Sequence, residues 1–302
     1  MTHPLVTISC ITYNHEKYIR DAIESFLAQQ TSFPIEILIH DDASTDKTTN
    51  IIREFEQKHP DLIFPLYQTE NQYSKGVKPE KINQDRARGK YLAYCEGDDY
   101  WPDPLKLQKQ VDFLEANPDY SLTYCRFKTL DQSTGQFLND KNEFYFDSCD
   151  DAIDFDFEKF YAGWHMGNQT LVYRMSMCNR KYPFPYKFAR DIHLVTDLLI
   201  QGKGACLNFF GAVYRKHERG LFSGATEYQN ARRSYLCYKE IYENHKSIYY
   251  LKLKYIKFTQ FYIEQLLLAR EYFSAFQRSI EIFLLGKDMK GLLNNLRRTV
   301  KR

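Results

Sequence analysis

The stretch Leu92-Ala93-Tyr94-Cys95-Glu96-Gly97-Asp98-Asp99-Tyr100-Trp101 decides how the rest of this chain is interpreted. A short apolar run, predicted as a β-strand over 90–95, leads directly into two adjacent carboxylates. Neighbouring carboxylates repel each other and resist burial, so folding alone gives little reason for the pair. A divalent cation would explain it, because hard cations prefer carboxylate oxygens and bridge to phosphates. A plain turn is the alternative, since Gly-Asp-Asp also suits turn geometry.

A second acidic cluster lies upstream. Residues 36–40 are predicted as another buried strand, and Asp41-Asp42-Ala43-Ser44-Thr45-Asp46 follows it directly. In open α/β sheets, ligands bind outside the carboxyl ends of the strands. Two strands that both end in acids therefore indicate one shared crevice.

Strand and helix patterns alternate along the first 127 residues, which favours an α/β fold with a mostly parallel central sheet flanked by helices. The predicted strands are 5–12, 36–40, 62–67, 90–95 and 121–127, and the predicted helices are 15–30, 48–59, 80–88 and 104–117. Beyond residue 128 we expect a long loop with a helix near 151–161, a strand at 170–174, a helix at 191–201 and a strand pair at 205–210 and 212–216. From Tyr228 onward the chain is predicted to be helical, with one apolar stripe from Leu251 to Phe283.

Length and charge indicate one large domain with an appendage. At 302 residues and 43% hydrophobic, the chain can bury a sizeable core. We divide it into a domain over 1–227 and a helical extension over 228–302. The extension carries 15 Lys and Arg against 6 Asp and Glu, whereas the preceding residues carry 26 against 33. The basic extension points to an anionic partner or surface, and the acidic front suits a metal-dependent site.

The sequence has neither a signal-peptide pattern nor an apolar run of about 18 residues. Its seven cysteines are scattered without a C-x-x-C pair, which argues against metal clips and a disulfide framework. We therefore expect reduced thiols and a cytoplasmic location. Peripheral attachment to the inner face of the plasma membrane is a further expectation.

Four segments, in this order, give the chain a resemblance to the family 2 glycosyltransferases, which have the nucleotide-sugar-binding GT-A fold. Val6-Thr7-Ile8-Ser9-Cys10-Ile11-Thr12-Tyr13-Asn14 resembles the family's first strand, and the segment from Asp41 to Asp46 resembles its Asp-Asp-Gly-Ser-Thr-Asp segment. Glu96-Gly97-Asp98-Asp99 resembles the acidic metal-binding motif, with Glu96 in place of the usual first Asp. Tyr214-Arg215-Lys216-His217, with Gly220 and Ser223 after it, resembles a closing segment of bacterial members.

The resemblance implies roles on the donor side. Tyr13 would stack on the nucleobase and Asp42 would accept one of its N–H groups, while Asp98 would lie against the ribose or diphosphate. Asp99 would ligate Mn²⁺ or Mg²⁺ that bridges the diphosphate of a nucleotide-sugar donor, with a UDP-sugar as the first expectation. His217 would be a further metal ligand or diphosphate contact, and a loop histidine in a basic turn is the equal alternative.

The resemblance also implies an acceptor side. Inverting transfer needs a base on the acceptor hydroxyl. Asp191 is the candidate for this catalytic base, although Arg190 stands where another acid is common, and Asp197 is the fallback. The residues expected on the diphosphate or acceptor side are Arg215, Lys216 and Trp101.

The function that follows is metal-dependent, inverting transfer of a hexosyl or N-acetylhexosaminyl group to a saccharide or lipid-linked saccharide acceptor during surface glycan synthesis. A non-catalytic nucleotide-sugar or partner-binding module of the same fold is the alternative. The first strand is not followed by G-x-G-x-x-G, which disfavours a dinucleotide-dependent oxidoreductase, and a basic tail alone is weak evidence for nucleic-acid binding. The stripe in 228–302 would pack on the domain or on a second copy of the chain, and its basic residues would suit an anionic membrane surface.

Overall fold

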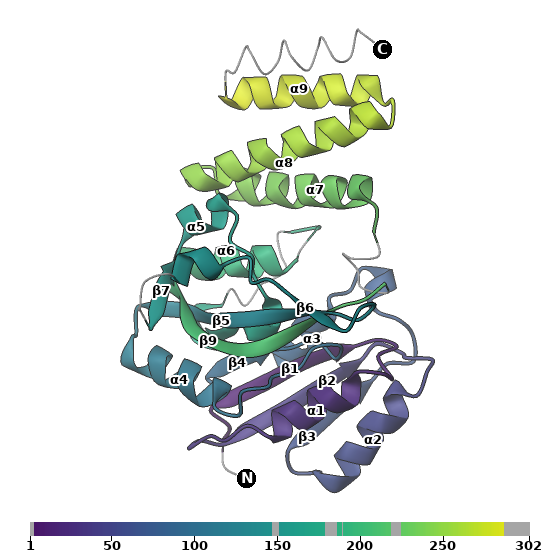
Figure 1. Ribbon diagram of the computed structural model, residues 1–302, viewed down its shortest axis with the longest axis vertical. Helices are drawn as coiled ribbons and strands as arrows, with labels where there is room; N and C mark the ends of the chain where they lie inside the picture. The colour runs from purple at the N-terminus through teal and green to yellow at the C-terminus, as the bar shows by residue number, and fades with distance from the viewer. Residues whose placement is uncertain (1–2, 147–150, 179–185, 189, 219–224, 287–302) are drawn as a thin grey trace. The chain divides into compact units, whose positions relative to one another are not determined.

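A computed structural model describes residues 3–146, 151–178, 186–188, 190–218 and 225–286 (Figure 1). The chain forms two compact units. The sheet unit comprises Met1–Asp156, Trp164–Pro183 and Leu194–Lys216, and the helical unit comprises Phe157–Gly163, Phe184–His193 and His217–Arg302. The α/β class predicted from the sequence is confirmed.

The sheet unit is built on one mixed sheet with the strand order β3-β2-β1-β4-β8-β5-β9-β7, and β6 pairs with β5. β1 pairs in parallel with β2 and β4, β2 with β3, and β5 with β9, whereas β8 is antiparallel to β4 and β5. The strands are β1 (Val6–Thr12), β2 (Ile35–Asp41), β3 (Ile63–Tyr67), β4 (Tyr91–Tyr94), β5 (Tyr120–Asp131), β6 (Gln136–Leu138), β7 (Ala152–Phe155), β8 (Val172–Arg174) and β9 (Lys203–Lys216).

Helices flank this sheet in the order that the sequence patterns predicted. They are α1 (Ile19–Leu27), α2 (Thr48–Lys58), α3 (Pro79–Arg86), α4 (Lys106–Ala116) and α6 (Asp191–Gln201), whose first three residues belong to the helical unit. The short helix α5 (Phe157–Ala162) belongs to the helical unit as well.

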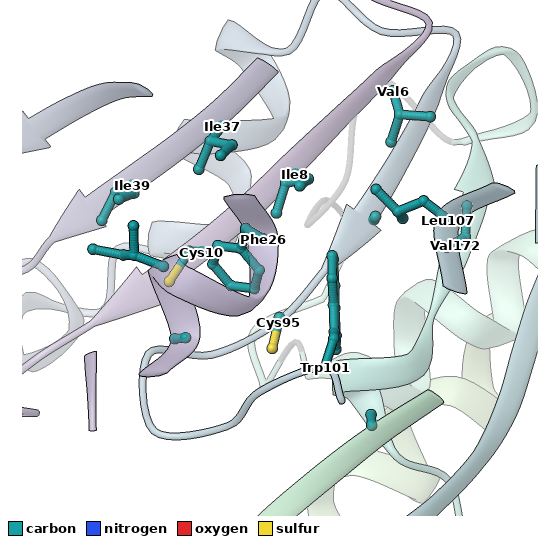
Figure 2. Packing of buried hydrophobic residues seen from close by; sticks show 14 of the residues in the cluster. Val6, Ile8, Cys10, Phe26, Ile37, Ile39, Cys95, Trp101, Leu107 and Val172 are labelled. Carbon is teal, nitrogen blue, oxygen red and sulfur yellow. The ribbon is translucent and has the colours of Figure 1, made fainter. Parts of the chain in front are cut away.

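One face of the sheet is apolar, because alternate residues of a strand point to the same side. Val6, Ile8 and Cys10 of β1 are completely buried on this face. Helix α1 contributes Phe26, and Figure 2 shows its ring in the same cluster as Cys10 and Trp101. The apolar spacing of the first strands and helices therefore produces the core that it predicted.

The opposite face of the sheet is polar, although it is also buried. Thr7 donates to the Glu36 carboxylate at 2.7 Å, and Arg88 pairs with the same carboxylate. Asn83 of α3 donates to the backbone oxygen of Cys10 at 3.0 Å. Because the Thr7, Glu36 and Asn83 side chains have hydrogen-bond partners, α3 can cover this part of the face without the cost of leaving these groups unsatisfied.

Two predictions about the second half of the sheet unit were wrong. The expected strand pair at 205–210 and 212–216 is the single strand β9, which stays paired with β5 through register shifts around Arg126. Gly211 permits this pairing, because a Cβ there would lie 2.6 Å from the Cys125 sulfur. The expected helix over 151–161 is divided into β7 and α5.

The helical unit contains α7 (Glu227–Asn244), α8 (Tyr249–Leu268) and α9 (Tyr272–Gly286), each packed on the next. A capping box formed by Thr226 and Gln229 begins α7. The apolar stripe predicted from Leu251 to Phe283 is divided between α8 and α9, because the chain turns at Arg270, where φ is 61°. A residue in this left-handed conformation commonly ends a helix.

Tyrosines and one acidic group fill the space among these helices. The Tyr235 ring stacks 5.1 Å from Tyr262, and its hydroxyl donates to Glu281 at 3.0 Å. Burial alone would raise the pKa of Glu281. The hydrogen bonds from Tyr255 and Lys239 and the charge of Arg278 have the larger effect, so the pKa is lowered. None of the helices among the described residues combines the length and the apolar character that crossing a membrane requires.

Candidate functional site

The carboxyl ends of β1, β2 and β4 meet at one edge of the sheet. Thr12 pairs with Asp41, and Ser9 pairs with Tyr94, so the acids after β2 and β4 follow strands that lie on either side of β1. This edge is where open α/β sheets bind their ligands.

Reciprocal hydrogen bonds join the loops after β1 and β2. The Asn14 N–H donates to the Ser44 hydroxyl at 2.9 Å, and the Thr45 N–H donates back to the Asn14 side chain at 2.7 Å. The second set of bonds runs from the Glu16 N–H to Asp46 at 3.1 Å and from the Lys47 N–H to Glu16 at 3.0 Å. The two loops therefore form one support, and Tyr13, on the first loop, keeps 43% of its surface exposed.

Ala43 has a backbone conformation that favours glycine. Its φ is 65°, in the left-handed region, and the resembling family segment carries glycine at this position. A side chain with a Cβ costs roughly 1–2 kcal/mol in this region. The strained turn directs the chain from Asp42 into the joined loops.

Asp42 is buried and holds a neighbouring loop in place. Its two carboxylate oxygens accept the N–H groups of Gln72 at 2.7 Å and Tyr73 at 3.0 Å. His40 lies 3.5 Å from the same carboxylate, and burial lowers the pKa of this imidazole despite the nearby charge. Asp42 is thus oriented by the protein, and its Oδ2, which accepts the Tyr73 N–H, still has a lone pair for a further donor.

Gly97 allows the acidic motif to approach β1. A Cβ at this position would lie 2.6 Å from the Thr12 hydroxyl oxygen, a distance that side chains do not tolerate. The Gly97 N–H instead donates to the Ile11 oxygen at 2.9 Å. The segment after β4 therefore continues alongside β1 and delivers Asp98 and Asp99 at the edge of the sheet.

Asp98 and Asp99 are both buried. The Asp98 carboxylate lies 3.7 Å from Nε2 of His15. Burial, and then the charge of Asp98, raise the pKa of Asp99 well above its usual range, although an N–H donated by Arg215 acts in the opposite direction. A cation beside this pair would relieve both the repulsion and the loss of solvent.

Arg215 holds the acidic motif from the far end of β9. Its N–H donates to Oδ1 of Asp99 at 2.8 Å, and its guanidinium donates to the Asp98 backbone oxygen at 3.0 Å and to the Asp21 carboxylate at 2.5 Å. The guanidinium also lies 4.4 Å from the centre of the Tyr100 ring. Arg215 was expected on the diphosphate or acceptor side. In the structure, its buried guanidinium contacts the acidic motif and Asp21.

The other two residues expected on that side lie in different surroundings. Lys216 is exposed and pairs with Asp131 at 3.4 Å. Trp101 is buried in the core, where its indole N–H donates to the Gln169 oxygen at 2.7 Å and its ring lies 4.9 Å from Phe26. Its observed role is packing and support for the loop after the acidic motif.

The candidate bases and His217 fall in different units. Asp191 is the first residue of α6 and belongs to the helical unit, as does the half-buried His217. Asp197 lies further along the same helix, belongs to the sheet unit and is buried. Gly220 and Ser223 of the closing segment lie outside the described residues.

The acidic motif has the chemistry of a cation site that a substrate would complete. Within the described residues, no group of three or more His, Cys, Asp and Glu side chains is arranged to hold a metal ion. Mg²⁺ sites commonly use only one or two carboxylates, with phosphate oxygens and waters as the other ligands. Asp98 and Asp99, with their buried and mutually repelling carboxylates, fit a site of this kind.

Sequence reasoning missed the contacts that fix the site from a distance. The backbone pairing of Tyr100 with Val213 and the hydrogen bonds from Gln72 and Tyr73 to Asp42 come from segments without a chemical motif. The Tyr-Arg-Lys-His segment carried a signal for Arg215, but its residue types suggested contact with an anionic substrate rather than with the protein's own acids.

Comparison with known proteins places these observations in a family. The family model described as "Glycosyl transferase family 2" matches residues 7–181. An uncharacterized protein of Mycobacterium tuberculosis is 34% identical over 221 residues, which are 73% of this chain and 61% of that protein. The chain thus spans less than two thirds of the length of this relative.

Two named relatives match shorter segments. The putative teichuronic acid biosynthesis glycosyltransferase TuaG of Bacillus subtilis is 37% identical over 40% of this chain and 46% of its own length. The UDP-Glc:α-D-GlcNAc-diphosphoundecaprenol β-1,3-glucosyltransferase WfaP of Escherichia coli is 36% identical over 37% of this chain and 42% of its own length.

Solved structures share the fold at low sequence identity. S. aureus TarS in complex with UDP-GlcNAc aligns with a TM-score of 0.60 and 19% identity, over 98% of this chain and 80% of that one. A mannosyltransferase from Pyrobaculum calidifontis, in complex with GDP-Man and Mn²⁺, aligns with a TM-score of 0.57 and 16% identity, over 100% of this chain and 87% of that one.

Proposed function

The chain belongs to glycosyltransferase family 2, and we propose that it transfers a hexosyl or N-acetylhexosaminyl group, with inversion, from a nucleotide-sugar to a saccharide or lipid-linked saccharide acceptor in surface glycan synthesis. The observation that carries the proposal is the sheet edge where Tyr13, Asp42 and the Asp98–Asp99 pair follow three adjacent parallel strands. An aromatic face, an oriented carboxylate and an acid pair are the groups needed to bind a base, its N–H and a diphosphate with its cation.

On the donor side, Tyr13 stacks on the nucleobase and Asp42 accepts one of its N–H groups. The exposed ring of Tyr13 is free of the core, and the Asp42 carboxylate is held in one orientation by Gln72 and Tyr73. A UDP-sugar is the first donor that we propose, because UDP-GlcNAc is the ligand bound to the TarS structure.

Asp99, together with Asp98, would hold Mn²⁺ or Mg²⁺ against the donor diphosphate. When bound, the ion supplies Lewis-acid stabilisation of the charge on the leaving nucleoside diphosphate. The chain's own contribution is to keep both carboxylates buried and fixed, which Arg215 does through its bonds to Asp99 and to the Asp98 backbone. His217 remains a proposed additional ligand or diphosphate contact.

On the acceptor side, Asp191 takes the proton from the acceptor hydroxyl. Inversion requires a base opposite the leaving group, and Asp191 offers a carboxylate at the first residue of α6. The basic segment 228–302 is proposed to bring the protein to an anionic membrane surface that presents a lipid-linked acceptor.

The test is a donor panel of UDP-, GDP-, CMP- and dTDP-sugars, with N-acetylglucosamine linked through diphosphate to a soluble lipid as the acceptor. Nucleotide release and thermal shift are measured with Mn²⁺, Mg²⁺ or EDTA, for the natural chain, for Asp99→Ala and for the control Asp112→Ala on the exposed face of α4. We expect release with one donor class, lost with EDTA and in Asp99→Ala but kept in the control. Absence of metal-dependent binding by every donor would refute the proposal and favour a binding module without catalysis.

A further inference from the structure

Glu240, on α7, accepts two backbone N–H groups just ahead of Asp191. The N–H of Lys187 donates to one carboxylate oxygen at 2.5 Å, and the N–H of Phe188 donates to the other at 2.9 Å. The Glu240 side chain is only 14% exposed. A carboxylate that accepts two adjacent amides fixes the position of that peptide segment more firmly than a single bond would.

A second contact of Glu240 fixes the chain on the other side of Asp191. His193 is fully buried, and its Nδ1 accepts the N–H of Arg190 at 3.1 Å. Its Nε2 therefore carries the proton when the ring is neutral, and this atom lies 3.4 Å from the Glu240 carboxylate. Asp191 lies between Phe188, whose N–H Glu240 accepts, and His193, whose ring lies beside the same carboxylate, so Glu240 contacts the chain on both sides of Asp191.

Other residues of α7 complete the anchor. The Cys237 thiol donates to the Phe188 oxygen at 3.4 Å, and the Tyr186 hydroxyl lies 2.7 Å from Nε2 of His245, the residue that ends α7. Burial, and then the charge of Asp191, raise the pKa of Tyr238 on the same helix.

Helix α7 is itself firmly supported. Its N-terminus is capped by Thr226 and Gln229, and the Tyr238 ring stacks on Phe258 of α8 at 4.4 Å between ring centres. A segment anchored to such a helix has less freedom than a loop anchored to solvent-exposed residues. Catalytic groups need placement within about 0.5 Å, which side-chain packing and supporting hydrogen bonds provide.

From this geometry we infer that α7 belongs to the catalytic apparatus and that Glu240 is the positioning residue for Asp191. The inference rests on the proposed function, in which Asp191 is the base. It gives the C-terminal helices a role in the acceptor half of the reaction, and it assigns that role to a side chain that does not itself contact substrate.

The test compares Glu240→Ala and Glu240→Gln with the control Glu243→Ala, an exposed residue one turn away that pairs with Lys239. Asp191→Asn serves as the reference for loss of the base. Transfer is measured with the donor selected by the panel and the diphosphate-linked N-acetylglucosamine acceptor.

We expect kcat to fall about tenfold or more in Glu240→Ala, because small misplacements of a reacting group have effects of this size. The KM for the donor should change by less than about twofold, because a misplaced base slows the chemical step and leaves donor binding intact. Glu240→Gln should recover part of kcat, since its amide oxygen still accepts one N–H.

Hydrogen exchange provides a readout that does not depend on turnover. The amides of Lys187 and Phe188 should exchange faster in Glu240→Ala than in Glu243→Ala. If Asp191→Asn is inactive while Glu240→Ala matches the control in kcat or in exchange, the inference is overturned and the proposed function stands. If Asp191→Asn retains full transfer, the base assignment itself falls. Should Glu240→Ala fail to fold, the folded Glu240→Gln variant decides by the same comparison of kcat with donor KM.

Discussion

The backbone N–H of Arg215 donates to Oδ1 of Asp99 across 2.8 Å, although the two residues are 116 positions apart in the chain. The last residues of β9 thereby define the shape of an acidic motif that begins at the end of β4. The Tyr100–Val213 pairing adds a second backbone link between the same segments. The acidic motif is therefore built from two distant parts of the sequence.

Replacing Arg215 should weaken both the fold and the donor site. In Arg215→Gln, the bonds to the Asp98 oxygen and to Asp21 are lost, and hydrogen bonds with a charged partner are worth about 1.5–3 kcal/mol. We expect the free energy of unfolding to fall by about 2 kcal/mol and Mn²⁺ affinity to fall with it. Urea unfolding and titration of Mn²⁺ followed by electron paramagnetic resonance measure the two effects. Lys216→Gln, at the exposed neighbour, is the control, and equal behaviour of the two variants would contradict the structural role.

Ala43→Gly should stabilise the protein. The left-handed conformation at this position costs alanine roughly 1–2 kcal/mol, and the greater freedom of glycine in the unfolded chain offsets part of that gain. We expect a net increase of about 0.5 kcal/mol in the free energy of unfolding. Thermal and urea unfolding measure it, with Ala87→Gly, at an extended position after α3, as the opposite case. A loss of stability in Ala43→Gly would show that the turn is not strained.

Lys106 should make stability depend on pH in the alkaline range. Burial lowers its pKa to about 8 from an ordinary value of 10.5, and its amine lies 4.0 Å from the Trp101 ring. Between these two values the unfolded chain binds more protons than the folded one, so stability rises with pH through this window. Relative to Lys106→Met, the natural chain should gain about 2 kcal/mol between pH 8 and pH 10. Parallel urea unfolding of both chains measures the difference, and identical slopes would contradict the shift.

Trp101→Phe should lower stability and leave donor binding unchanged. The substitution removes the bond from the indole N–H to the Gln169 oxygen and leaves a small space beside Phe26. We expect a loss of about 1–3 kcal/mol in the free energy of unfolding, the cost of an unsatisfied buried group plus reduced packing. Donor titration on the folded variant is the decisive measurement, because a changed affinity would restore Trp101 to the diphosphate side.

The local part of the site was accessible from the sequence, since it depends on neighbouring residues. Strands 36–40 and 90–95 could be recognised from their apolar runs, and the acids that follow them mark the edge where the sheet binds ligands. The bulged course of β9 was not accessible, because the pairing of Arg126 with Phe210 and of Phe127 with Ala212 depends on register shifts that no local pattern encodes.

The same limit applies to the helical unit. The apolar spacing from Leu251 to Phe283 continues across Arg270, so periodicity alone predicted one continuous stripe where the backbone makes two helices. Likewise, Glu240 looks like an ordinary charged residue on an amphipathic helix. Its importance comes from two backbone amides more than fifty positions earlier in the chain, which only the fold brings to it.

The joined loops after β1 and β2 have an evolutionary consequence. The Ser44 hydroxyl accepts the backbone N–H of Asn14, and the Asn14 side chain accepts the backbone N–H of Thr45, so a substitution at Ser44 or at Asn14 leaves a backbone N–H of the other loop without its acceptor. Each loop therefore constrains the side chains that the other can carry, and an acceptor side chain should be retained at both Ser44 and Asn14 in related chains. Grafting a new nucleotide preference onto this scaffold would therefore require exchanging both loops together rather than either one alone.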